Sequence, residues 1–86
     1  MHDQKNWGKP TFANLFSLYG LNYGALRQLE QTTGLSWMTI HAIYLGQPVS
    51  RGSAEVALAA FSELVQYKHT LENTTIPLLE EEKRLS

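Results

Sequence analysis

Gly20, Gly34 and Gly46 divide the first half of the chain into short segments in which apolar residues recur at helical spacing. Glycine often follows the last turn of a helix, because it adopts the left-handed backbone conformation without steric strain. The pattern predicts helices over residues 12–19, from between 22 and 25 to about 33, over 37–45, and from Ser50 or Ser53 to about 68. The expected fold is therefore all-α, a small bundle of four to five short helices.

The two ends of the chain lack this helical pattern. Residues 1–10 are polar and predict a flexible N-terminal arm, and residues 11–69 contain the predicted helical domain. Residues 70–86 form a predicted C-terminal extension, in which Thr74-Thr75-Ile76 favours extended structure and Pro77 prevents a continuous helix. Three interpretations of this extension remain open: a docking or dimerisation segment, a partner-facing strand, and a frayed tail.

The composition excludes several classes of protein. The chain has 86 residues and no cysteine, which indicates one domain without disulfides or thiolate metal sites. No apolar run is long enough to span a membrane and the start does not resemble a signal peptide, so a cytoplasmic protein without membrane contact is expected. The three histidines lack metal-ligand spacing, and no phosphate loop or nucleophile motif is present. Neither an enzymatic activity nor a cofactor or metal is expected.

The stretch from Leu26 to Leu64, LRQLEQTTGLSWMTIHAIYLGQPVSRGSAEVALAAFSEL, carries an ordered series of turn and core positions. These positions are Leu29, Gly34, Leu35-Ser36, Thr39-Ile40, Ile43, Gly46 and Pro48-Val49-Ser50. The series resembles the helix-turn-helix domains of phage-repressor-like (Xre-type) transcriptional regulators. The resemblance implies a lambda-repressor-like bundle whose recognition helix is residues 37–45. It also implies sequence-specific binding of double-stranded DNA by a repressor-like regulator that acts as a homodimer.

Two positions depart from the pattern of that family. Glu30 stands where relatives carry alanine or another small residue, and a buried carboxylate without a partner would be costly. We therefore expect Glu30 to turn toward solvent or to pair with Arg27 or Arg51, with a slightly opened angle between the two helices. Leu26 stands where relatives often place a polar residue that touches phosphate.

The resemblance also implies which residues contact DNA. The base-facing positions are Ser36, Trp37, Met38, His41 and Ala42. The phosphate-facing positions are Arg27, Thr39, Arg51, Lys5 and Lys9. The outward face of the recognition helix has no arginine or lysine, so no bidentate arginine–guanine pair can form there. Contact with thymine methyl groups and one histidine contact remain, and so few cations predict weak, salt-sensitive binding by a monomer.

An interpretation of a different class uses the same residues. Trp37 and Met38 would then form an exposed apolar patch for a protein partner, and residues 76–79 of the C-terminal extension would join that surface. The chain would be a protein–protein interaction module, antitoxin-like or adaptor-like, that keeps the fold without binding DNA. The net charge of −1 agrees with this alternative, because strongly DNA-binding domains are usually basic.

Overall fold

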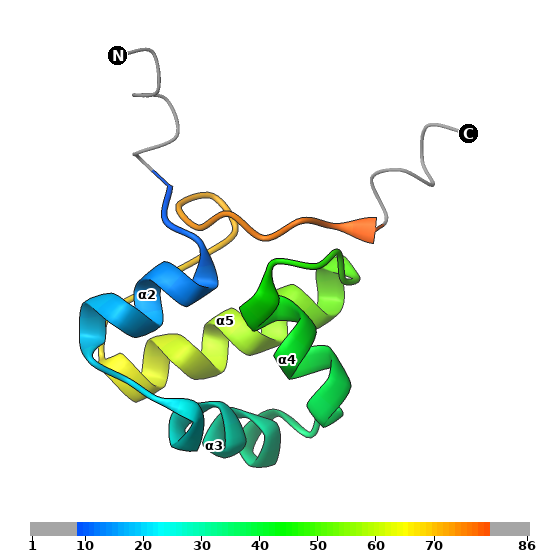
Figure 1. Ribbon diagram of the computed structural model, residues 1–86. Helices are drawn as coiled ribbons and strands as arrows, with labels where there is room; N and C mark the ends of the chain where they lie inside the picture. Colours follow the sequence, from blue (N-terminus) through cyan, green and yellow to red (C-terminus); the bar gives the residue numbers. More distant parts are fainter. Residues whose placement is uncertain (1–8, 80–86) are drawn as a thin grey trace.

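The computed structural model describes residues 9–79, and its regular structure is helical (Figure 1). The helices are α2 (Phe12–Tyr19), α3 (Tyr23–Thr33), α4 (Trp37–Leu45) and α5 (Arg51–Val65). Helix α3 packs against both α4 and α5, and α2 packs against α4. Within residues 9–79 the β structure is limited to isolated bridges. The predicted all-α class is thus confirmed for the described chain, and none of its helices has the length and apolar character needed to cross a membrane.

The ends of the helices follow from local hydrogen bonds that the sequence supplies. Thr11, Asn22, Ser36 and Ser50 cap the four N-termini, and each side chain accepts a backbone N–H of the first turn. The three predicted stops are confirmed, because Gly20, Gly34 and Gly46 all have positive φ and follow the last helical residue. Local chemistry therefore explains the bounds of α2, α3 and α4.

Helix α5 ends earlier than the sequence predicts, at Val65 rather than near residue 68. Gln66 adopts the left-handed conformation with φ 59° and its N–H bonds to the carbonyl of Ser62. The chain then reverses, and the N–H of His69 donates to Ser62 Oγ at 2.8 Å. This return contact is a tertiary interaction, which helical periodicity alone does not reveal.

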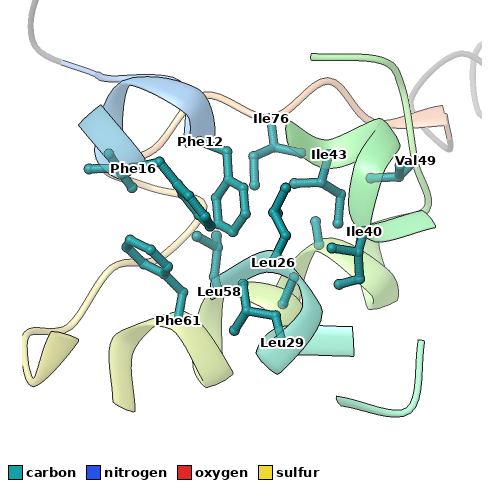
Figure 2. Packing of buried hydrophobic residues seen from close by; sticks show 13 residues of the cluster. Phe12, Phe16, Leu26, Leu29, Ile40, Ile43, Val49, Leu58, Phe61 and Ile76 are labelled. Carbon is teal, nitrogen blue, oxygen red and sulfur yellow. The ribbon is translucent and has the colours of Figure 1, made fainter. Parts of the chain in front are cut away.

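The core lies where the four helices meet (Figure 2). Phe61 of α5 packs against Phe12 and Phe16 of α2, with ring centroids 5.2 and 5.4 Å apart. Aliphatic side chains fill the remaining space, namely Leu15, Leu26, Leu29, Ile40, Ile43, Val49, Ala54, Ala57, Leu58 and Ile76. Ile76 is notable in this group because it belongs to the predicted C-terminal extension.

Residues 74–79, which we name the C-terminal strap, cross the bundle from the start of α2 to the loop between α4 and α5 (Figure 1). At one end the N–H of Thr75 donates to the carbonyl of Pro10 at 2.9 Å. At the other end the N–H of Val49 donates to the carbonyl of Pro77, and the N–H of Leu79 donates back to the carbonyl of Val49. Residues 74–79 thus pack on the helices of this chain, while the three interpretations of the whole extension, residues 70–86, stay predictions.

Candidate functional site

The connection between α3 and α4 is short and tied by local hydrogen bonds. Gly34, in the left-handed conformation, donates its N–H to the carbonyl of Glu30 at 3.1 Å. The hydroxyl of Thr33 donates to the carbonyl of Leu29 and accepts the N–H of Leu35. These bonds satisfy backbone groups that a helix end would otherwise leave without partners, so the relative position of the two helices is well defined.

The inward faces of α3 and α4 form part of the core. Leu26 and Leu29 of α3 and Ile40 and Ile43 of α4 are all buried. Because Leu26 is fully buried, a polar side chain at that position would lose its hydration. One long face of α4 is therefore occupied by the core, and only the remaining faces can contact a partner.

Glu30 of α3 is paired rather than buried without a partner. Its carboxylate accepts a hydrogen bond from the Arg27 guanidinium at 3.1 Å, and both side chains remain partly exposed. The expected pairing with Arg27 is thus confirmed. The slightly opened angle between the helices stays a prediction.

A layered group of side chains joins α3 to the first turns of α4. Trp37 and His41 of α4 stack with centroids 5.3 Å apart and planes 13° from parallel. The Arg27 guanidinium lies 3.9 Å from the centroid of the Trp37 ring, a cation–π geometry. Tyr23 closes the group, because its hydroxyl and His41 Nε2 share a hydrogen bond of 3.1 Å. We name Tyr23, Arg27, Trp37 and His41 the Trp37 stack.

The predicted base-facing residues differ in their surroundings. Trp37 and His41 are half-buried in the stack, and Ala42 packs against the core. The Ser36 hydroxyl caps α4 and hydrogen-bonds to the Thr39 hydroxyl at 3.0 Å. Met38, by contrast, is 79% exposed. Leu45, at 54% exposed, lies seven residues and about two helical turns further along α4.

The predicted phosphate-facing residues occupy several parts of the molecule. Arg27 is exposed beside α4, and Thr39 is half-buried at its first turn. Arg51 is the exposed first residue of α5, and Lys9 is exposed just before α2. Lys5 lies outside the described residues. Whether these cations grip one phosphate backbone stays a prediction.

Sequence reasoning missed Tyr23 as a member of this region. Tyr23 precedes Arg27 by four residues on α3, so the two side chains lie on the same helix face. That spacing was a usable signal for an aromatic–cation cluster. The approach of both side chains to Trp37 depends on the packing of α3 against α4, which lies beyond local sequence.

A second polar group lies away from α4, at the junction of α2 and the segment after α5. The Tyr19 hydroxyl and His69 Nε2 share a hydrogen bond of 2.9 Å, and the His69 ring packs against Phe61 and Tyr67. Burial lowers the pKa of His69 below its ordinary value of 6.5. An open groove of about 870 Å³ runs beside it, between α5 and residues 66–72.

Neither this region nor the rest of residues 9–79 contains a group of three or more histidine or acidic side chains arranged to hold a metal. No family model, curated protein or solved structure matches the chain. The functional argument therefore depends on the geometry of the described residues.

Proposed function

We propose that this protein binds double-stranded DNA through α4, in the manner of a helix-turn-helix of the lambda-repressor-like kind, and acts as a small repressor-like transcriptional regulator. The observation that carries the proposal is the pair α3–α4, joined by the three-residue turn 34–36, with α4 buried along Ile40 and Ile43 and open at Met38. A helix held in this way can enter the major groove with its N-terminal half near the bases.

The cations around α4 support contact with the phosphate backbone. Arg27, paired with Glu30 but 60% exposed, lies beside the first turn of α4, and Arg51 is at the start of α5, while α4 itself contains no acidic residue. The N-terminus of α4 adds a partial positive charge at Ser36. Because the cations are few, we propose that a homodimer on two half-sites supplies the affinity that one copy lacks.

A second candidate function is an antitoxin-like or adaptor-like protein–protein interaction module. The observation that favours it is the exposure of Met38 and Leu45 on a helix without lysine or arginine. Exposed apolar residues of this kind often mark a protein interface. DNA binding requires cations such as Arg27 and Arg51 for contact with phosphates, whereas binding of a protein partner does not require them.

Fluorescence anisotropy with a labelled random-sequence duplex at low salt tests the proposal. We expect measurable binding that weakens as salt rises, and a uniform loss of affinity for Arg51→Ala across different duplexes. Lys68→Ala is the matched control, because this exposed cation follows the opposite end of the 15-residue helix α5. Non-specific DNA binding usually has a dissociation constant of about 1–100 μM at physiological salt and is tighter at low salt. Absence of binding at tens of micromolar protein in low salt would therefore overturn the DNA proposal and leave the adaptor function.

A further inference from the structure

The groove between α5 and residues 66–72 is lined by carboxylates that have no partner. Glu55 and Glu63 of α5 and Glu72 of the following segment all belong to its lining. Within residues 9–79 none of these three carboxylates forms a hydrogen bond or an ion pair. The groove therefore offers negative charge that the fold itself does not neutralise.

Two cations also line the groove, toward the two ends of α5. Arg51 is the first residue of the helix and is itself engaged in a further interaction, and Lys68 lies beyond its last residue. Along α5 between these cations, the charged side chains are Glu55 and Glu63. A cationic group seated over the middle of the helix would therefore be attracted by both carboxylates.

A ring nitrogen of His69 also opens on the groove. His69 is 9% exposed and belongs to the lining, and its Nε2 is bonded to the Tyr19 hydroxyl. Its Nδ1 has no hydrogen-bond partner within residues 9–79, and it is not sealed from outside, because every sealed polar side-chain atom of the described residues has a partner. The backbone of an extended segment in the groove can hydrogen-bond to this nitrogen, through its N–H or C=O according to the tautomer of the ring.

The lining has a repeat along α5 that an extended chain can match. Glu55, Ala59 and Glu63 follow one another at intervals of four residues, which is about 6 Å along the helix axis. In an extended chain, side chains on the same face recur about every 6.7 Å. The complement of the groove is therefore an extended segment with basic, apolar and basic side chains at alternate positions.

Residues 5–9 of this chain, which we name the arm motif, have that order. Their sequence is Lys-Asn-Trp-Gly-Lys, with the lysines at positions 5 and 9 and the tryptophan at position 7. Lys9 of the same copy is exposed and outside the lining of the groove, and its carbonyl accepts a hydrogen bond from Thr75 Oγ1 at 3.0 Å. A second copy can supply the motif, because Lys9 remains exposed where the motif joins the bundle.

We infer that the groove of one copy holds the arm motif of a second copy. The two lysines then meet Glu55 and Glu63, and Trp7 lies over Ala59. The exposed ring of Tyr67 at the side of the groove offers an aromatic contact for Trp7. The exchange of arms gives the chain a dimer surface that is separate from α4, and it withdraws the lysines of the motif from contact with phosphate.

Sedimentation velocity of the full chain without DNA tests the inference. The wild-type protein should form a dimer whose population rises with concentration. Charge reversal in the arm motif, Lys5→Glu with Lys9→Glu, should weaken the dimer about tenfold or more, and so should reversal in the groove, Glu55→Lys with Glu63→Lys. An equimolar mixture of the two reversed proteins should dimerise again, because each arm then meets a groove of opposite charge.

Substitutions at neighbouring positions provide the controls. Trp7→Ala should weaken the dimer, whereas Asn6→Ala should leave it unchanged, because alternate side chains of an extended segment point to opposite faces. Circular dichroism verifies that every variant keeps its helices.

The possible results are distinct. A protein that stays monomeric up to about 1 mM would overturn the inference, since no weaker dimer is of use at a two-site interface. A dimer that neither reversal weakens would place the dimer surface elsewhere and overturn it. Loss of the dimer in both reversed proteins without recovery in their mixture would also overturn it, because the arm and the groove would then not be partners. DNA binding is decided separately by the anisotropy titration.

Discussion

Truncation of Ile76 to alanine tests whether the C-terminal strap is an integral part of the fold. Ile76 is 7% exposed and lies in the same buried cluster as residues of all four helices (Figure 2). It is inserted from a segment whose regular structure is limited to the bridges Thr11–Thr75 and Val49–Leu78. If the strap packs on the core in solution, removing this side chain should lower the free energy of unfolding as much as a mutation within the helical core.

The magnitude follows from the burial of the side chain. Truncation of a buried isoleucine to alanine costs about 2–5 kcal/mol, because apolar contacts are lost and a cavity remains. We expect about 3 kcal/mol for Ile76→Ala. A chain of 86 residues has a total stability of about 4–13 kcal/mol. The variant should therefore lose between about a quarter and three quarters of its stability, with a fall in Tm of about 12–24 °C.

Urea unfolding followed by circular dichroism at the helical band measures the difference. Leu79→Ala is the matched control, because Leu79 belongs to the same strap but is 48% exposed, and its backbone bond to Val49 survives the substitution. We expect a loss below about 1 kcal/mol for the control. Equal and small losses for the two variants would refute the reasoning, since they would show that the strap contributes no buried contact to the folded state in solution.

Three further predictions concern single residues. Burial lowers the pKa of His69, so as pH falls below 6.5 this histidine is protonated more readily in the unfolded chain than in the folded one. The free energy of unfolding should therefore decrease from pH 7 toward pH 5.5. His69→Gln should flatten that dependence in urea titrations. Gly34→Ala should cost about 1 kcal/mol in thermal unfolding, because φ is +79°, although the added Cβ meets no atom within 4 Å. Gly52→Ala within α5 is the control and should not destabilise the protein. Equal effects of the two substitutions would contradict this account. Ser36→Ala removes the N-cap of α4 and should cost about 1 kcal/mol, and an unchanged Tm would show that the cap bond is not formed in solution.

Much of the fold could be predicted from sequence because its signals are local. A cap residue meets N–H groups two or three positions later, and a stop glycine sets its own backbone, so α2 and α4 have the bounds that the sequence predicts. The pairing of Glu30 with Arg27 is local in the same sense, because the two residues are three apart on one helix. These features need no knowledge of the rest of the chain.

The candidate site was only partly predictable. Helical periodicity places Met38 on the outside of α4, and the structure confirms that exposure. The base-facing role of Trp37 and His41, which the resemblance implies, stays a prediction. What periodicity does not reveal is that the two rings stack on each other and contact Arg27 and Tyr23 of α3. The orientation of a side chain at the edge of a helix depends on the neighbouring helix, and periodicity carries no information about that neighbour.

The sequence by itself determined where the helices begin and end and which of their faces are apolar, because hydrogen bonds and backbone strain within a few residues decide both. Only the tertiary structure decided the place of the C-terminal strap and the engagement of the polar groups of α4. Thr75 bonds to the carbonyl of Lys9, 66 residues earlier, and Ile76 completes a core assembled from four other elements. Such contacts form only when the helices have packed, since the entropy of closing so long a loop must be offset by burial.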